Sequence, residues 1–324
     1  MKYIIGAYST APSLGSNDLE SEQQYYKLLL KIVPDLRGLE IPFWEDSIHK
    51  FGNDFLLQYI NPEWENVITC IPGSVMSLPI NSKFGLASND ESGRNLALAL
   101  HKKTNEIIHK INKSTLKKSI IAVQIATAPS VPAKGVSSSP DALRKSLKEM
   151  CSWDWMGARL NIEHCDEALN DNSFEKGFLS LKDEIEVIGS ISSECNMGIT
   201  LNWARSAIEG KNPNRVIDHI KLTQENKVLS GFIFSGTSSN DKAYGIWKDK
   251  HMPFARSNGI EHYEDNSLLT EEIISNTIDS IDLSTIDYIG IKLLSMPIES
   301  STLERRVGVN RDAIIILNKI LKNR

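Results

Sequence analysis

The sequence predicts an α/β protein, a single (β/α)8 TIM barrel that covers residues 1–324. Eight short apolar runs rich in Ile, Val and Leu alternate with longer segments of helical period. No Gly-, Ser- or Pro-rich linker divides the chain into halves. The alternative is a doubly wound open sheet, but neither a GxGxxG nor a Walker-type phosphate loop is present to favour it. Strict alternation of strands and helices therefore favours the closed barrel.

The apolar runs are predicted to be parallel strands that are covered on both faces. They span residues 3–9, 36–43, 66–73, 119–127, 158–164, 197–203, 229–236 and 288–294. The helical segments between them span residues 18–33, 55–60, 93–113, 139–150, 174–194, 213–224, 267–281 and 311–323. Ser139 followed by Pro140 is typical of an N-cap and the first position of a helix.

One connection departs from this regular pattern. Residues 236–266 follow the seventh strand and show no clear element. A loop of this length inside a compact domain is usually functional or disordered. Its stretch "YGIWKDKHMPFAR" is aromatic and mixed in charge, which predicts an ordered lid.

Composition narrows the binding partners and the cellular compartment that suit this chain. The net charge of −5 and the lack of a basic stripe argue against nucleic acid or an anionic membrane as a partner. No apolar run reaches the length of about 18 residues that a membrane helix needs. The four cysteines show no CxxC spacing, so we expect neither a disulfide framework nor a zinc ribbon, and a reducing cytoplasm fits best.

Alternation along the strands predicts which polar side chains enter the barrel. In each strand concerned, the apolar residues share the face toward the helices, and polar residues occupy the other face. The residues that this places inside, near the C-terminal strand ends, are Glu40, Gln124, Glu163, Asn202 and Lys292. Any one of them could be a satisfied core residue, but active sites of this fold lie at that end. We therefore predict a functional site there, with an ion pair between Glu163 and Lys292, because buried charges need partners.

Further candidates lie outside the strand interiors. "WKDKHMP" in the long loop offers Trp247, Asp249 and His251. An Asp two residues before a His can bind a metal or serve as acid and base, but it can equally be a solvated turn. Arg205 could hold an anionic substrate group, although a surface salt bridge is the alternative. His164 has outward parity, which favours a packing role.

These residues resemble the xylose-isomerase-like TIM barrels. The resemblance rests on "NIEHCDE" at the end of the fifth strand, the inward positions of strands two, six and eight, and the "WKDKHMPFA" loop. More narrowly, the chain is similar to an uncharacterised bacterial family within that superfamily. The superfamily includes sugar isomerases, epimerases and endonuclease-type enzymes. Dimers and tetramers are common among them, so the resemblance is compatible with a homo-oligomer.

The resemblance also implies where a metal would lie and why this chain departs from the pattern. The superfamily holds a divalent ion with Glu, Asp, His and Glu after strands five to eight. Glu163 matches the first position, whereas Asn202, Ser235 and Lys292 stand at the other three. A protonated lysine cannot bind a metal, and its charge repels one. We therefore expect no metal or other cofactor at this centre.

The resulting prediction is an enzyme that acts on a small carbohydrate or sugar-acid derivative by moving a proton next to a carbonyl. Glu163, Lys292 and His251 are the predicted catalytic residues. The predicted substrate-binding residues are Glu40, Gln124, Asn202, Arg205, Trp247 and Asp249. A Schiff base through Lys292 would instead indicate a lyase or aldolase. The alternatives are a non-catalytic sugar-binding or regulatory protein, and a metal-dependent isomerase with Glu163, Asp249 and His251 as relocated ligands.

Overall fold

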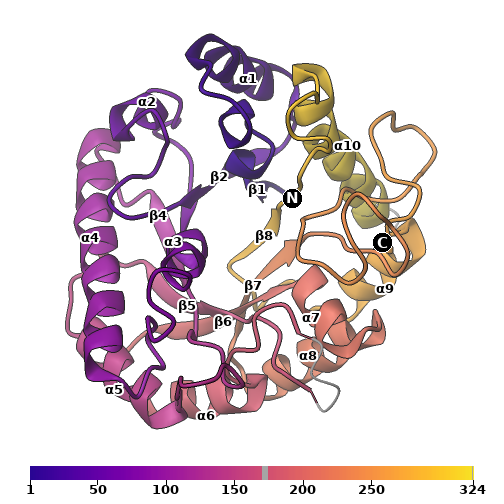
Figure 1. Ribbon diagram of the computed structural model, residues 1–324. Helices are drawn as coiled ribbons and strands as arrows, with labels where there is room; N and C mark the ends of the chain where they lie inside the picture. The colour runs from indigo at the N-terminus through magenta and orange to yellow at the C-terminus, as the bar shows by residue number, and fades with distance from the viewer. Residues whose placement is uncertain (170–173, 323) are drawn as a thin grey trace.

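Eight parallel strands close into a barrel in the computed structural model, which describes residues 1–169, 174–322 and 324. The strands are β1 (Tyr3–Ile5), β2 (Leu36–Pro42), β3 (Asn66–Thr69), β4 (Ile120–Ile125), β5 (Arg159–Glu163), β6 (Met197–Asn202), β7 (Leu229–Phe234) and β8 (Tyr288–Ile291). Each strand pairs with the next along the chain, and β8 closes the ring on β1. The predicted (β/α)8 barrel is therefore confirmed, and Figure 1 shows the helices surrounding it.

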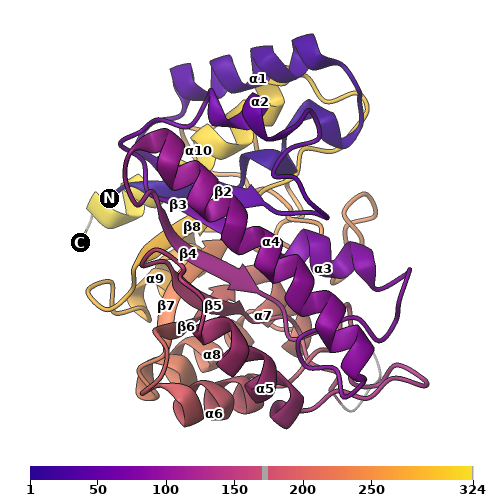
Figure 2. The ribbon, with the colours of Figure 1, turned by 90° about the vertical axis from the view of Figure 1, so that its left-hand side faces the viewer.

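The described residues also form ten α-helices. They are α1 (Leu19–Ile32), α2 (Asn53–Leu57), α3 (Ile71–Ser77), α4 (Glu91–Thr115), α5 (Pro140–Cys151), α6 (Leu181–Ile191), α7 (Trp203–Gly210), α8 (Asn214–Glu225), α9 (Glu271–Asp279) and α10 (Leu303–Lys322). Figure 2 shows the longest of these, α4, lying across the outside of the barrel. Helices α3 and α7 were not predicted, and each begins within two residues of a strand end. The last predicted helix extended to residue 323, which lies outside the described residues.

Local sequence signals explain where several helices begin. The Ser139 side chain accepts a hydrogen bond from the Ala142 N–H, and Pro140 occupies the first helical position, as predicted. Asn202 caps α7 in the same way, with its side chain accepting from the Ala204 N–H at 3.1 Å. This cap starts a helix directly at the C-terminal end of β6. The chain thereby places the first turn of α7 at the mouth of the barrel.

Strand alternation places the apolar layer toward the helices as predicted, and a second apolar layer, which was not predicted, lies inside the barrel. Outward residues such as Leu39, Ile162 and Ile289 belong to the large core between the strands and the helices. A separate apolar layer fills the barrel interior and consists of Ile4, Val67, Ala122, Ile233 and Tyr288. Each fully buried aliphatic side chain contributes about 1.5–3 kcal/mol to stability, so both layers favour this strand register over a slip by one residue.

Cysteine pairing departs from the sequence-based expectation. Cys151 at the end of α5 and Cys195 just after α6 form a disulfide, with their Cα atoms 5.4 Å apart. The two helices pack side by side, which brings together residues that are 44 positions apart in the sequence. The expectation of no disulfide was wrong for this pair, because spacing along the chain does not show which helices are neighbours. Cys70 and Cys165 are free and buried.

The long connection after β7 contains neither a helix nor a strand between residues 235 and 270. Isolated bridges join Gly236 to Met252 and Ser238 to Ile246. In Figure 1 it is the orange segment beside α9 and α10. In the described part of the chain, no helix is long and apolar enough to cross a membrane.

Candidate active site

The first ion pair at the C-terminal mouth joins Lys292, just after β8, to Glu40 in β2. The Lys292 Nζ donates to Oε1 of Glu40 at 2.9 Å, and both side chains are 1% exposed. The expected pairing of Lys292 with Glu163 was therefore wrong. Gly6 follows β1 between these two strands. A Cβ there would lie 3.1 Å from both Glu40 Oε2 and Lys292 Cγ, so the missing side chain leaves room for the pair.

Glu163 at the end of β5 pairs instead with a residue of α7. The Arg205 Nη1 lies 2.7 Å from Oε1 of Glu163, and both side chains are buried. Asn202 donates from Nδ2 to the same oxygen at 3.2 Å while its own Oδ1 caps α7. The amide thus has two duties that an aspartate could not combine, because a carboxylate has no hydrogen to donate. The structure brings Glu163, Asn202 and Arg205 together.

The loop after β7 carries two of the predicted residues into this network. Asp249 accepts from the Arg205 Nε at 3.0 Å and also forms an ion pair with Lys176, which precedes α6. The His251 Nδ1 lies 3.3 Å from Oδ1 of Asp249 and 2.9 Å from the Ser235 Oγ at the end of β7. The loop therefore reaches the barrel mouth at Asp249, which links through Arg205 to Glu163.

Two of the predicted substrate-binding residues lie apart from this network. Gln124 donates to the Tyr288 hydroxyl at 3.2 Å, which itself lies 2.6 Å from the Thr200 Oγ1 inside the barrel. Trp247 lines a cleft of about 380 Å³ together with Phe174 and Ile208. Gln124 thus belongs to a hydrogen-bonded group inside the barrel, and Trp247 belongs to this cleft.

The charged groups of the site shift one another's pKa values. Burial by itself raises the pKa of Glu163, but the nearby Arg205 and Lys292 charges hold it below its usual value. Burial raises the pKa of Glu40, and Lys292 offsets this only in part. Burial lowers the pKa of Lys292, but the Glu163 and Glu40 carboxylates outweigh that effect and raise it. Glu163 is therefore a carboxylate and Lys292 an ammonium at neutral pH.

Several buried oxygens of the site have no hydrogen-bond partner. They are Oε2 of Glu40, Oε2 of Glu163 and Oδ1 of Asp249. A buried acceptor that is left unpaired costs about 1–3 kcal/mol, and more when it is charged. Folded proteins seldom retain several such atoms in one place without a use for them. These oxygens mark the mouth as a place where polar groups of a ligand can bind.

The mouth does not fit the divalent metal that the resemblance implies. Oε1 of Glu163 already accepts from Asn202 and pairs with Arg205, and Lys292 stands where a carboxylate ligand is needed. The relocated set fails for the same reason, because Asp249 lies between Arg205 and Lys176. At about 4 Å and an effective dielectric near 20, each pair of like unit charges costs roughly 4 kcal/mol. Lys292, Arg205 and Lys176 would therefore repel a divalent ion at the mouth.

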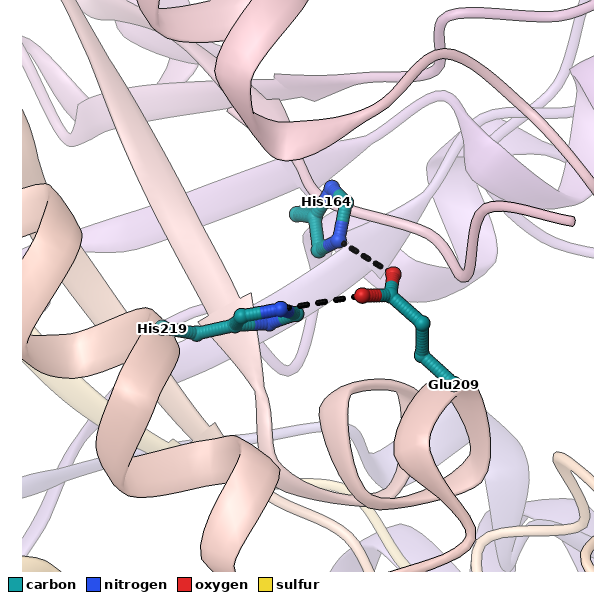
Figure 3. Close-up of side chains that lie close together, drawn as sticks. All are labelled: His164, Glu209 and His219. Atoms are coloured by element: carbon teal, nitrogen blue, oxygen red, sulfur yellow. Dashed lines mark hydrogen bonds and ion pairs between the residues drawn. The ribbon is translucent and has the colours of Figure 1, made fainter. Parts of the chain in front are cut away.

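A second polar group lies outside the barrel, between the strands and the helices. His164 points outward, as predicted, and its Nε2 contacts Oε2 of Glu209 in α7 at 3.1 Å. The His219 Nε2 in α8 contacts Oε1 of Glu209 at 3.0 Å (Figure 3). One potential ligand atom from each residue lies within 4.8 Å of the others, and all three residues are buried, so this group could hold a metal ion.

Sequence reasoning missed Lys176, Glu209 and His219. Lys176 fell within a segment expected to be helical, and His219 lies on a predicted helix with no partner of its own nearby in sequence. Glu209 belongs to α7, the short helix that was not predicted. The signal that could have predicted α7 is Asn202 at a strand end, because Asn is a strong N-cap. The helix that it starts carries both Arg205 and Glu209.

A family model and a sequence relative identify the family of this chain. The model of DUF4862, described as a domain of unknown function, matches residues 4–309. The chain belongs to this family. An uncharacterised protein of Salmonella typhimurium is 34% identical to it over 317 residues, which is 98% of this chain and 97% of that one.

Several solved structures share the fold of this DUF4862 protein at low sequence identity. An IolI protein with a bound zinc atom aligns with a TM-score of 0.61 at 12% identity, covering 99% of each chain. A structure of L-ribulose 3-epimerase aligns with a TM-score of 0.59 at 12% identity, covering 99% of this chain and 94% of that one. A D-psicose 3-epimerase determined in the presence of D-fructose aligns with a TM-score of 0.58 at 12% identity, covering 99% of each chain.

Proposed function

We propose that this DUF4862 protein is an enzyme that moves a proton next to the carbonyl of a small carbohydrate or sugar acid, with cations of its own chain in place of a metal at the reacting centre. The observation that carries the proposal is the pair of buried carboxylates, Glu40 and Glu163, beside the ammonium of Lys292. Each of these two carboxylates has one oxygen without a hydrogen-bond partner. The epimerases of similar fold support sugars as the substrate class.

Glu163 is the proposed base. Arg205, Lys292 and the amide of Asn202 stabilise its ionised form, while its Oε2 is left without a partner. An ionised carboxylate with one unpartnered oxygen can take a proton from a carbon next to a carbonyl. Arg205 holds the other oxygen at 2.7 Å and thereby fixes the direction of the base.

Lys292 is the proposed electrophile. Removal of that proton leaves negative charge on the carbonyl oxygen of the substrate, and a buried ammonium stabilises such an oxyanion. The raised pKa of Lys292, caused by the Glu163 and Glu40 carboxylates, keeps the amine protonated. A protonated amine is not a nucleophile, so this electrostatic role is favoured over a Schiff base.

His251 is the proposed second proton carrier. Burial lowers its pKa to about 3, because the nearby Asp249 offsets that effect only in part and the Lys292 charge adds to it. The ring is therefore neutral at neutral pH. Its Nδ1 lies 2.9 Å from the Ser235 Oγ and 3.3 Å from Oδ1 of Asp249, so Nε2 is the atom proposed to accept or return a proton. Its side chain is 18% exposed, against 0% for Glu163. Substrate entry then requires the loop that carries Asp249 and His251 to open.

The test follows the proton itself. The purified protein is incubated in D2O with panels of ketoses, aldoses and sugar acids, and NMR measures deuterium uptake next to the carbonyl and the formation of isomers. We expect exchange in at least one sugar class and a decrease of about 100- to 10,000-fold in Glu163→Gln. Glu65→Gln, a half-exposed carboxylate on the opposite end of the barrel, should retain the full rate.

A negative result is equally informative. Sugars that bind to the protein in calorimetry but exchange no proton in any panel would contradict the enzyme and favour a non-catalytic sugar-binding protein. Equal exchange by the wild type and by Glu163→Gln would remove Glu163 as the base.

A further inference from the structure

We propose that His164, His219 and Glu209 bind one divalent transition-metal ion, with zinc as the best match, in the helix layer outside the barrel. The group is separate from the mouth, where the chain's own cations exclude a metal. Two imidazoles and one carboxylate are a ligand set that zinc prefers. The inference does not depend on the reaction proposed for the mouth.

The spacing of the ligand atoms suits a small tetrahedral ion. Each imidazole Nε2 lies 3.0 or 3.1 Å from an oxygen of Glu209. Zinc bonds to nitrogen and oxygen are about 2.0–2.1 Å, which separates neighbouring tetrahedral ligands by about 3.3 Å. The three residues come from the end of β5, from α7 and from α8, and Figure 3 shows both rings directed at the one carboxylate. Small side-chain adjustments, together with removal of the hydrogen that Nε2 of each ring directs at Glu209, would convert the hydrogen-bonded group into a coordination sphere.

The second nitrogen of each ring has the partner that a metal-binding histidine needs. The His164 Nδ1 lies 2.8 Å from Oε2 of Glu184, whose other oxygen accepts from the Thr127 hydroxyl at 2.8 Å. The His219 Nδ1 lies 3.0 Å from the Ser206 Oγ, a group that can either donate or accept. Histidines that ligate metals usually donate their remaining N–H to such partners, which fixes the ring and leaves Nε2 for the ion. A buried Glu184 behind His164 is the carboxylate–histidine arrangement of zinc sites.

Arg215 is the group that an ion would have to displace. Its Nε and Nη2 donate to Oε1 of Glu209 at 2.9 and 2.7 Å. The Arg215 side chain is 33% exposed, so it can turn toward solvent at little cost. Glu167 lies at the same edge, with its backbone N–H donating to Oε2 of Glu209 at 3.0 Å, and its carboxylate or a water can complete the coordination. Arg215 therefore holds the site in its metal-free form and lies at its solvent edge.

The proposed ion would tie together the elements that hold the mouth. His164 directly follows Glu163 on β5, and Glu209 lies one helical turn after Arg205 on α7. A metal bound to both His164 and Glu209 would fix the distance between Nη1 of Arg205 and Oε1 of Glu163, which is 2.7 Å in this structure. The ligands would then act as positioning residues rather than catalytic ones.

The test measures metal binding directly. Protein freed of metal with a chelator is titrated with Zn²⁺ in calorimetry and with Co²⁺ by visible absorption, and bound zinc is counted by elemental analysis after gel filtration. We expect one ion per chain, the intense visible bands of tetrahedral cobalt, and a rise in melting temperature with zinc. Glu184→Gln should weaken binding by about 10- to 100-fold, as loss of an orienting partner does.

Three further variants locate the site. His219→Gln keeps a donor for Glu209 but should lose the ion, whereas Arg215→Gln removes the competitor and should bind zinc more tightly than the wild type. His109→Gln, at an exposed histidine of α4 that contacts the Asp154 carbonyl, should bind as the wild type does. Absence of cobalt bands and of retained zinc would overturn the proposal. Stoichiometric zinc that survives in His219→Gln and is lost in Glu163→Gln would also overturn it, by placing the ion at the mouth.

Discussion

The ammonium of Lys292 donates to Oε1 of Glu40 at 2.9 Å inside the barrel, where each side chain is 1% exposed. Removing one partner of such a pair leaves the other charge buried without compensation. We expect Lys292→Met to lower the free energy of unfolding by about 3–5 kcal/mol, measured by urea denaturation. The double variant Lys292→Met, Glu40→Gln should recover much of this loss, because no unpaired charge then remains at Glu40. Strictly additive losses would contradict an interaction between the two residues.

Asn202→Asp tests why an amide stands at the end of β6. Aspartate can still accept the hydrogen bond from the Ala204 N–H, so α7 should begin as before. It cannot donate to Glu163, and it places a second carboxylate where the amide now lies 3.2 Å from Oε1. We expect a loss of about 1–3 kcal/mol of unfolding free energy at pH 7, decreasing toward pH 4 as one carboxyl takes up a proton. A variant as stable as the wild type at pH 7 would show that the donated hydrogen bond is dispensable.

Asp249→Asn tests how the loop after β7 is held over the mouth. The change deprives Arg205 and Lys176 of the carboxylate between them. We expect faster hydrogen–deuterium exchange in residues 244–252 and a loss of roughly 3 kcal/mol of unfolding free energy, because two buried cations lose a partner. Lys248→Gln is the matched control. It removes the half-exposed ion pair with Glu175 and should cost less than about 1 kcal/mol without changing exchange at Asp249. Similar exchange in both variants would contradict Asp249 as the anchor of the loop.

His101 on α4 should make stability depend on pH. Its Nδ1 contacts the Ala97 carbonyl at 2.7 Å, its Nε2 has no partner, and burial lowers its pKa to about 4. The unfolded chain takes up this proton near pH 6.5, whereas the folded chain takes it up only near pH 4. The unfolded state therefore binds more protons between these values, and stability is lost as the pH falls through that range.

The expected contribution of His101 is about 3 kcal/mol between pH 7 and pH 4, as the difference between the wild type and His101→Gln in urea denaturation at each pH. His109→Gln, an exposed change on the same helix, should leave the profile of the wild type unchanged. Parallel pH profiles for the wild type and His101→Gln would show that the ring is already protonated in the folded protein.

The direction of each inward side chain was set by the sequence alone. Alternation along single strands predicted Glu40, Glu163 and Lys292 inside the barrel and His164 outside it, and the structure agrees. The period of two is a property of the extended backbone and needs no knowledge of neighbouring strands. The alternation of eight apolar runs with helical segments was sufficient to predict the barrel.

Only the tertiary structure decided which of these side chains meet. Lys292 pairs with Glu40 across the glycine that follows β1, whereas Glu163 pairs with Arg205 on a helix that begins at the Asn202 cap. The carboxylate of Glu209 joins His164 and His219, which are 55 positions apart along the chain, and Asp249 reaches the mouth from a loop. Periodicity gives the face of a strand, but ion pairs and metal ligands depend on distances across strands and helices, which the closure of the barrel sets.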